Sequence, residues 1–378
     1  MDQKLAVLFM PDDMTLTKEQ TPLMLRPILF CPILTWMVEE LMGRGIERFF
    51  IVSDKRAHDM MRPYVPENAD VVYVDGARHG EELLTLLKDE KGSVLIVNGA
   101  VLPVGVFSGG AVYSADAKEC CKVLKEHGAF AAFPKGAEIT KGFLPVGDDE
   151  ELRSAQDMCR RKIADKHFAA GVSIMDPNNT YIDPRVKIGS GTVILPGTIL
   201  RGRTVIGKNC TIGPNAMIRD CVIGDETEVN ASQLNESTVG AHTTVGPFAY
   251  VRPNSKIGDH VKVGDFVEIK NSVIGNGTKI SHLTYVGDSD CGERINFGCG
   301  TVTTNYDGFK KFRCTIGDDA FIGCNTNLIA PVTVGNGSYI AAGSTITDEV
   351  PENALALARA RQVNKPGWAE TWREAHKK

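Results

Sequence analysis

"VIGKNCTIGPN", residues 205–215, and "KIGDHVKVG", residues 256–264, place an aliphatic residue followed by glycine once in every six residues. The same step continues through much of the second half of the chain. The aliphatic positions are Ile206, Ile212, Ile218, then Val239, Val245, Val251, Ile257, Val263, Ile269, and later Ile316, Ile322, Leu328, Val334, Ile340 and Ile346. A six-residue period of this kind is typical of a hexapeptide-repeat parallel β-helix.

The period has a direct physical meaning. Each hexapeptide supplies one short strand and a turn, and three hexapeptides close one triangular coil. The aliphatic side chain points into the prism, and glycine permits a tight corner. One coil cannot bury its apolar face alone, so many must stack. An irregular all-β domain would not hold this period, and we therefore predict an all-β, left-handed parallel β-helix over residues 182–350.

The period breaks once, at "TVTTNYDGFKKFRC", residues 301–314. This segment is too long for two hexapeptides and contains the turn-forming sequence Asn-Tyr-Asp-Gly. We expect a loop that projects from the prism. Insertions into a solenoid usually lie on one face, which is often the binding face.

The first half of the chain has a different pattern. Apolar segments such as "KLAVLFM", "RFFIVSD" and "SVLIVNGAV" alternate with segments of helical spacing such as "PILTWMVEELMGRGI" and "GEELLTLLKDE". Strands that alternate with helices indicate an α/β domain with a parallel, Rossmann-like sheet. The expected domains are an α/β domain at 1–150, a helical linker at 151–181, the β-helix at 182–350 and a tail at 351–378.

Composition excludes some classes of function. The net charge of the 378 residues is −5, so no basic excess points to nucleic acid. We find neither a signal peptide nor an apolar run long enough to span a membrane. The ten cysteines are scattered without a C-x-x-C spacing, which favours reduced thiols in a cytoplasmic protein over zinc or disulfides.

The three-hexapeptide coil also predicts which side chains stack. Arg252 and Lys270 each follow an inward aliphatic residue and stand one full coil apart, so both should point outward, one above the other. Stacked cations repel unless an anion lies between them, and a phosphate would suit an arginine and a lysine. A pair of solvated surface cations fits the same pattern.

Two weaker patterns accompany this pair. Cys324 and Ala342 are also one full coil apart, and small stacked residues could leave a groove for a thin ligand arm, although they are equally ordinary in a solenoid. His282 falls near a coil corner, and Glu268 lies beside Lys270. A histidine, a carboxylate and two cations could form a general-base site beside an anion site, whereas a lone surface histidine needs no role.

Four longer motifs carry a family resemblance: "GPFAYVRP" (246–253), "VGDFVEIKNSVIGNGTKISHLTYVGDSD" (263–290), "INFGCGTVTTNYDG" (295–308) and "IGDDAFIGCNTNLIAPVTVG" (316–335). They closely resemble the acetyltransferase half of the bacterial bifunctional enzymes that join N-acetylglucosamine-1-phosphate uridyltransferase to glucosamine-1-phosphate acetyltransferase. The resemblance runs from about 169 to 368. It implies a homotrimer with its sites between neighbouring prisms.

The resemblance also implies residue roles. His282 would be the general base, and Glu268 would orient it. Sugar-phosphate contacts would come from Arg252, Lys270, Tyr285, Asn296 and, near the phosphates, Lys311. Acetyl-CoA contacts would come from Cys299, Asn305, Tyr306, Cys324, Ala342 and Arg359.

Cys299 and Cys324 depart from the family, where alanine and serine are common. If these positions act through small size and backbone contacts, activity should survive, but a lost hydroxyl at 324 could weaken acetyl-CoA binding.

The implied activity is acetyl-CoA-dependent N-acetylation of glucosamine-1-phosphate, a step of UDP-N-acetylglucosamine synthesis for peptidoglycan and lipopolysaccharide. A backbone N–H near Cys299 would stabilise the oxyanion. The acetyl transfer itself requires no metal, and neither nucleic acid nor a membrane is an expected partner.

The first half departs from the family's nucleotidyltransferase pattern at three points. No glycine-rich loop follows the first strand in "LFMPDDMTLTKEQTPLMLRP", Leu23 stands where a lysine is expected, and Ala100 stands where a metal-binding aspartate is expected. The domain is also about a third shorter than in the family. We therefore expect no uridylyl transfer, and a need for Mg²⁺ only if that half were active.

Three alternatives remain at this stage. The chain could be a bifunctional enzyme, an acetyltransferase for another amino-sugar phosphate, or a non-catalytic paralogue. The intact set of Arg252, Lys270, His282, Tyr285 and Asn305 argues against the last.

Overall fold

The computed structural model describes residues 4–13, 17, 19–105 and 110–377. It divides into two compact units, Met1–Val205 and Ile206–Lys378, which are described separately below. Residues 14–16 and 18 belong to the stretch predicted to have lost its glycine-rich loop, and they lie outside the described residues.

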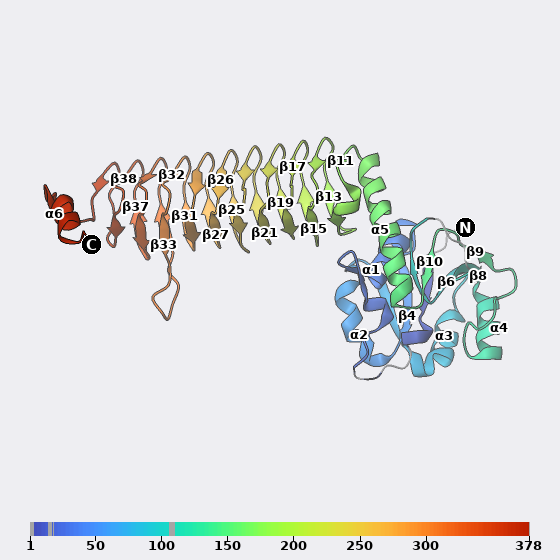
Figure 1. The fold of residues 1–378 in the computed structure, drawn as a ribbon. Coiled ribbons are helices and arrows are strands. Elements are labelled where there is room, and N and C mark those ends of the chain that lie inside the picture. Colours follow the sequence, from blue (N-terminus) through green and yellow to red (C-terminus); the bar gives the residue numbers. More distant parts are fainter. Residues whose placement is uncertain (1–3, 14–16, 18, 106–109, 378) are drawn as a thin grey trace. The chain divides into compact units, whose positions relative to one another are not determined.

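A six-stranded sheet forms the centre of the first unit (Figure 1). Its strands, in spatial order, are β5 (Asp70–Asp75), β4 (Arg48–Ser53), β1 (Leu5–Phe9), β6 (Ser93–Asn98), β8 (Val112–Asp116) and β9 (Glu138–Ile139). Two small antiparallel pairs accompany it: β2 (Pro27–Ile28) with β3 (Cys31–Pro32), and β7 (Ala100–Leu102) with β10 (Leu144–Val146).

The sheet is mixed, so the expectation of a parallel sheet is only partly correct. β5, β4, β1 and β6 are parallel, β8 runs antiparallel to β6, and β9 runs antiparallel to β8 and so in the same direction as β6. The physical reason is the connection between β6 and β8, whose described residues contain β7 and no helix. A parallel crossover needs a dozen or more residues, usually a helix.

The described helices of the first unit include those that the sequence predicts, at 32–46, at 80–90 and in the linker, and two at 55–61 and 117–127 that it does not predict. They are α1 (Ile33–Gly43), α2 (Lys55–Met61), α3 (His79–Leu87), α4 (Ala117–His127) and α5 (Asp149–Ala169), with the short 3₁₀ turns η1 (Pro11–Asp13), η2 (Leu23–Leu25), η3 (Arg62–Tyr64), η4 (Gly76–Arg78) and η5 (Pro177–Asn179). The Asp116 carboxylate caps α4, and Gly128 ends it at a φ of 68°. The apolar sides of α3 and α4 pack on the sheet, where Phe50, Ile96 and Tyr113 are buried.

The first coils of the β-helix also lie within this unit. β11 (Ser173–Ile174) pairs with β14 (Val193–Ile194), and β12 (Tyr181–Ile182) pairs with β15 (Ile199–Arg201), in parallel. β13 (Lys187–Ile188) completes a coil, and β16 (Val205–Ile206) lies at the division.

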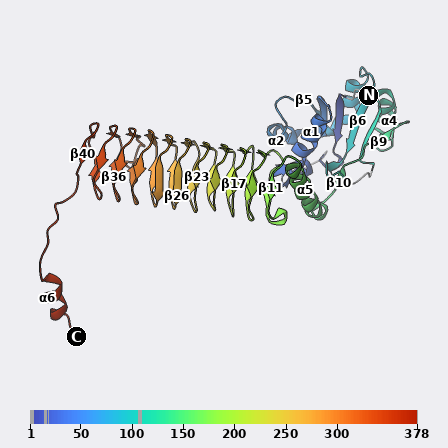
Figure 2. The same ribbon diagram turned by 90° about the horizontal axis from the view of Figure 1, so that it is seen from above.

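Three parallel sheets form the prism of the second unit (Figures 1 and 2). The first contains β17 (Thr211–Ile212), β20 (Glu228–Val229), β23 (Thr244–Val245), β26 (Lys262–Asp265), β29 (Lys279–His282), β32 (Asn296–Phe297), β35 (Phe321–Ile322), β38 (Tyr339–Ile340) and β40 (Leu355–Ala356). The second, called the site sheet below, contains β18 (Met217–Arg219), β21 (Gln233–Asn235), β24 (Tyr250–Val251), β27 (Glu268–Lys270), β30 (Tyr285–Gly287), β33 (Val302–Thr304), β36 (Asn327–Ile329) and β39 (Thr345–Ile346). The third contains β19 (Val222–Ile223), β22 (Thr238–Val239), β25 (Lys256–Ile257), β28 (Val273–Ile274), β31 (Ser289–Cys291), β34 (Cys314–Ile316) and β37 (Val332–Val334). A separate helix, α6 (Trp368–Ala375), lies in the tail.

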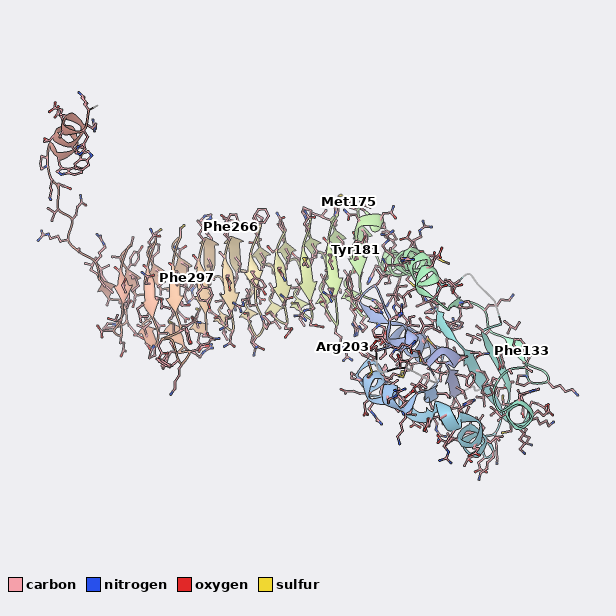
Figure 3. The ribbon with its side chains drawn as sticks, turned by 60° about the horizontal axis from the view of Figure 1, so that its bottom comes forward. Phe133, Met175, Tyr181, Arg203, Phe266 and Phe297 are labelled. Atoms are coloured by element: carbon pink, nitrogen blue, oxygen red, sulfur yellow. The ribbon has the colours of Figure 1, made fainter. Side chains whose placement is uncertain are left out.

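The repeat fills the prism with aliphatic side chains. Val251, Ile269 and Val286 stack in register and are fully buried. Phe297 is buried inside the prism, whereas Phe266 at a corner is 58% exposed (Figure 3). The predicted fold class, an α/β domain followed by a left-handed parallel β-helix, is confirmed.

The register deviates from a strict step of three hexapeptides. Val251 pairs with Ile269, which is one such step, but Asp265 pairs with His282, which is one residue short of it. Across the insertion the step is longer, and Asn296 pairs with Phe321. The extra residues form the loop between β33 and β34, which projects from the prism as expected (Figure 1).

Candidate functional site

One face of the site sheet brings together most of the predicted sugar-phosphate residues. Successive side chains of a strand point to opposite faces. Because Val251, Ile269 and Val286 point inward, their neighbours on β24, β27 and β30 point outward. Glu268 and Tyr285 are direct register partners on this outer face.

Two ion pairs fix the predicted cations at one edge of the site sheet. An Arg252 Nη1 donates to a carboxylate oxygen of Glu268 at 2.8 Å, and both side chains are 39% exposed. The Lys270 Nζ donates to Asp288 Oδ2 at 2.9 Å, with side-chain exposures of 17% and 6%. Arg252 and Lys270 therefore occupy the stacked positions that the coil period predicts.

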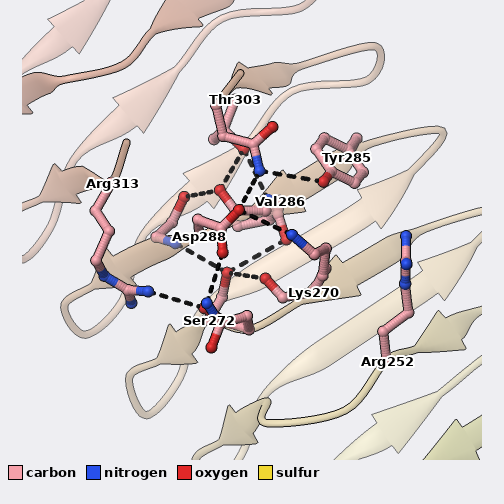
Figure 4. A network of polar contacts seen from close by, with 12 residues as sticks. Arg252, Lys270, Ser272, Tyr285, Val286, Asp288, Thr303 and Arg313 are labelled. Atoms are coloured by element: carbon pink, nitrogen blue, oxygen red, sulfur yellow. Dashed lines mark hydrogen bonds and ion pairs between the residues drawn. The ribbon is translucent and has the colours of Figure 1, made fainter. Parts of the chain in front are cut away.

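Asp288 is the centre of the polar network in Figure 4. Besides Lys270, the amide nitrogen of Asn271 donates to its carboxylate at 2.5 Å, and the Asn305 side chain donates as well. Burial by itself raises the pKa of the Asp288 carboxyl. The hydrogen bonds from Asn271 and Lys270, with the Lys270 charge, outweigh burial and hold that pKa below its usual range. Asp288 is therefore ionised and holds Lys270 and Asn305 in place.

The projecting loop adds a second lysine to this edge. Lys311 lies beside Lys270, and the neighbouring ammonium group lowers the pKa of Lys311. Arg313 anchors the loop base through two bonds to the Asp290 carboxylate, at 2.6 and 2.8 Å. Two lysines held together in this way repel each other, so an anion bound between them would be stabilised.

The histidine lies on the first sheet, at the corner where the chain turns into the site sheet. His282 and Asp265 are direct register partners on β29 and β26, and His282 Nδ1 lies 2.6 Å from Asp265 Oδ1. The hydrogen bond with His282 lowers the pKa of the Asp265 carboxyl. An ionised carboxylate can only accept, so Nδ1 donates to Asp265, and Nε2 is the ring nitrogen left for another partner.

The small residues predicted to line the acetyl-CoA site follow His282 along the same corner. The Asn325 N–H donates to the carbonyl oxygen of Cys299, and the Gly343 N–H donates to that of Cys324, so 299, 324 and 342 lie on successive coils. Cys324 is exposed. The Arg359 side chain reaches Gly343, beside Ala342.

The remaining predicted residues also have defined places. Asn296 lies on the outer face of β32 in the first sheet. Asn305 Nδ2 donates to the Tyr285 hydroxyl at 3.3 Å, which joins the two predicted contacts. Tyr306 is 56% exposed in the projecting loop and forms an isolated bridge with Lys311.

The structure differs from the expected orientation of the histidine by Glu268. Glu268 bonds Arg252, and the carboxylate on His282 belongs to Asp265. The reason is the strand register: Glu268 lies on β27 of the site sheet opposite Tyr285, whereas the short coil places Asp265 opposite His282 on the first sheet. Sequence reasoning missed both Asp265 and Asp288.

In the first unit, a carboxylate binds backbone N–H groups in the stretch where the family's glycine-rich loop is predicted to be lost. Buried Asp13 accepts the N–H of Leu23 at 2.7 Å and that of Met24 at 3.1 Å. Ala100 is buried in β7, paired with Val146.

Neither a metal-ligand cluster nor a membrane span is found in the part of the chain that the structure describes. Within it, no group of three or more His, Cys, Asp or Glu side chains is placed to hold a metal ion. No helix among the described residues is long and apolar enough to cross a membrane.

Two family descriptions match parts of the β-helix. "Bacterial transferase hexapeptide (six repeats)" matches residues 236–271 and 313–348, and "Hexapeptide repeat of succinyl-transferase" matches 203–231. Among solved structures, an Arabidopsis UDP-N-acetylglucosamine acyltransferase is 17% identical with a TM-score of 0.30, and the match covers 46% of this chain and 70% of that one.

Curated relatives are much more similar in sequence. A protein named Bifunctional protein GlmU from Geobacillus sp. (strain WCH70) is 51% identical over 249 residues, 66% of this chain and 54% of that protein. One of the same name from Thermoanaerobacter pseudethanolicus is 48% identical over 261 residues, 69% of this chain and 56% of that protein. The chain spans about half the length of the curated relatives it matches. The resemblance predicted from the motifs is confirmed: this is a hexapeptide-repeat chain related to the proteins named Bifunctional protein GlmU.

Proposed function

We propose that the chain is an acyltransferase that moves the acetyl group of acetyl-CoA to the amine of glucosamine-1-phosphate, in the synthesis of UDP-N-acetylglucosamine. The observation that carries the proposal is the site sheet. It has a cationic edge built from Arg252, Lys270 and Lys311, and a histidine–carboxylate pair lies at its corner with the first sheet.

The cationic edge would hold the sugar phosphate. Asp288 fixes the Lys270 ammonium, and Lys311 faces it from the loop. A phosphate there would relieve the repulsion between the lysines, and Arg252 could add a bidentate contact by exchanging Glu268 for the phosphate. Tyr285 and Asn296 would contact the amino sugar.

The histidine–carboxylate pair would carry the proton transfer. Asp265 holds the Nδ1–H of His282, which leaves Nε2 to accept a proton from the attacking amine. As the C–N bond forms, the carbonyl becomes an oxyanion, for which a backbone N–H near Cys299 is our proposed donor. The C–S bond then breaks, and coenzyme A leaves as a thiolate that takes up a proton. Asp265, in place of Glu268, is the proposed positioning residue.

The corner beyond His282 suits an extended thioester. Cys299, Cys324 and Ala342 have small side chains on successive coils, and Arg359 lies over Gly343 at the end of this row. Asn305 and Tyr306 would add contacts from the loop. If these positions act through size and backbone groups, the two cysteines are compatible with acetyl-CoA binding.

A complete site would need more than one copy of the chain. The cationic cluster lies at one end of the site-sheet strands and the His282–Asp265 pair lies on the first sheet, at the corner beyond their other end, so a neighbouring prism could bring one copy's histidine to another copy's cations. A homotrimer with its sites between prisms fits this arrangement, in the cytoplasm where acetyl-CoA is available.

An assay that follows the release of coenzyme A, by the reaction of its free thiol with a thiol reagent, tests the proposal. Wild-type protein should turn over with glucosamine-1-phosphate, and His282→Asn should lose about a hundredfold to ten-thousandfold of kcat. His260→Asn is the matched control, because His260 is also a corner histidine and asparagine tolerates its φ of 57°. Turnover unchanged in His282→Asn, or absent from wild-type trimer, would contradict the proposal. A panel of other amino-sugar phosphates distinguishes the acceptor.

We also propose that the first unit does not transfer uridylyl groups. Asp13 uses the N–H groups of Leu23 and Met24, Leu23 offers no cation, and Ala100 offers no metal ligand. UDP-N-acetylglucosamine formed from UTP, Mg²⁺ and N-acetylglucosamine-1-phosphate would refute this and favour the bifunctional alternative. An absence of acetyl-CoA binding in calorimetry would favour a non-catalytic paralogue.

A further inference from the structure

A pocket of about 440 Å³ lies within the first unit, apart from the site sheet. Its wall comes from α1, the segment after α2, the end of α5 and the first coils of the β-helix. The Thr35 hydroxyl donates to the carbonyl oxygen of Tyr64 at 2.8 Å and ties two sides of the wall together. The volume falls within the range of small-molecule sites, about 300 to 1,000 Å³.

Cations dominate the charged lining. Lys166, Arg185, Lys187 and Arg203 line the pocket, and Glu39 is the single acidic side chain among the lining residues. Arg203 comes from the first coils, where Figure 3 labels it. With Asp183 behind Arg185 counted, four cations face two carboxylates, which still leaves the pocket an excess of positive charge that favours an anionic ligand.

Arg185 is held in one orientation from behind. Its Nε and Nη2 donate to the two carboxylate oxygens of Asp183 at 2.9 and 2.7 Å. Asp183 is completely buried and also accepts the backbone N–H groups of Arg185 and Gly202. A planar guanidinium that is already fixed loses little entropy when it binds an anion, so this is a built site and differs from a group of solvated lysines.

The rest of the lining indicates the kind of molecule. Val65, Pro66, Val186 and Val205 supply apolar surface beside the cations. A bare inorganic ion would leave that surface uncovered, whereas a phosphate ester would place its phosphate on the cations and its body on the apolar wall. Arginine and lysine together suit phosphate best. We infer that this pocket is a second anion site, which binds a small phosphate monoester independently of the proposed acetyl transfer.

Calorimetry on the full chain tests the inference with glycerol 3-phosphate as the probe and glycerol as its uncharged control. The proposed sugar-phosphate site can also bind the probe, so variants must separate the two. Wild-type protein should bind two equivalents per chain. Lys166→Gln with Lys187→Gln should weaken one of them by about tenfold or more for each lysine lost, and Lys270→Gln should weaken only the other.

Lys256→Gln is the matched control. Like Lys187, Lys256 is the exposed first residue of a two-residue strand, but it does not line the pocket. Both lysines of the double variant are exposed, so the fold should persist, and thermal unfolding checks this. No loss or weakening of binding in the double variant would overturn the inference, whether wild-type protein binds one equivalent or two. Failure of acetyl transfer alone would refute the proposed function and leave this result intact.

Discussion

Asp13 in the first unit and Asp288 in the second are both buried carboxylates, and they bind different kinds of group. Asp13 accepts the backbone N–H groups of Leu23 and Met24, so it closes a loop on itself. Asp288 accepts the side chains of Lys270, Asn271 and Asn305, so it presents functional groups on a surface. Asp13 binds backbone N–H groups that a ligand could otherwise bind, whereas Asp288 holds the Lys270 ammonium in place, where an anionic ligand could bind it.

The difference follows from the backbone around each residue. Asp288 stands at a corner of a repeating coil, with a φ of 48°, and its neighbours on adjacent coils are fixed by strand register. Asp13 ends a short 3₁₀ turn after β1, where no repeat fixes its neighbours. A solenoid therefore converts single residues into vertical rows, whereas the α/β domain builds its sites from irregular loops.

Asp288→Asn should have the largest effect on stability. Asparagine tolerates the positive φ but removes the charge that pairs with Lys270. Breaking a buried ion pair by removing one partner costs about 3 to 5 kcal/mol, and a misplaced Lys270 should also raise KM for the sugar phosphate. Urea unfolding and steady-state kinetics measure the two effects. An unchanged free energy of unfolding with an unchanged KM would remove Asp288 from its proposed role.

His167 is a buried titratable residue of the first unit, and its titration offers a second test of how burial affects stability. Burial lowers the pKa of this α5 histidine from 6.5 to about 4. The unfolded chain takes up the proton near pH 6.5 and the folded chain only near pH 4, so stability is lost as the pH falls through this window. The full loss is about 3 kcal/mol, and urea unfolding at several pH values should show it.

His167→Gln removes the titrating group and should make that pH dependence shallower. His127→Gln is the control, since His127 is more exposed at the end of α4. Equal slopes for wild type and His167→Gln would contradict the assignment.

The regular part of the site was predictable from the sequence because the repeat fixes direction and spacing. Arg252 and Lys270 could be placed on one outer row from the period alone, and the structure puts them there. Asp288 could have been found in the same way, because it stands one full coil beyond Lys270 in the sequence. The corner row of Cys299, Cys324 and Ala342 crosses the coil that the projecting loop lengthens. The period alone therefore links Cys324 with Ala342 but does not link Cys299 with Cys324.

The rest depended on geometry that no fixed period contains. A coil one residue short places Asp265 opposite His282, and a regular step points elsewhere. The antiparallel pairing of β8 with β6 and β9 was missed because apolar alternation does not reveal strand direction. Arg185 and Lys166 were missed because they come from separate elements, and only the fold brings them to one pocket.

Asp13→Ala should have a smaller effect than Asp288→Asn. It leaves the N–H groups of Leu23 and Met24 without their acceptor, at a cost of about 2 kcal/mol in the free energy of unfolding. The kcat of acetyl transfer should stay unchanged, because the proposed acetyl site lies in the second unit. Urea unfolding and coenzyme A release measure both quantities. A large loss of kcat with normal folding would show that the two units are coupled.

Asp290→Asn should have the smallest effect and completes the contrast with Asp288. Asp290 lies shortly after it along the chain, and its pair with Arg313 is 51% and 41% exposed. Solvent screens such a pair, so we expect a loss of about 0.5 to 1 kcal/mol that shrinks further in high salt. Urea unfolding at two salt concentrations measures it. Because Arg313 also donates to the Asn271 carbonyl oxygen at 3.0 Å, the loop base should stay attached and KM should change little. A loss as large as that of Asp288→Asn would mean that the position of the loop, and not the burial of the carboxylate, determines how firmly Lys270 is held.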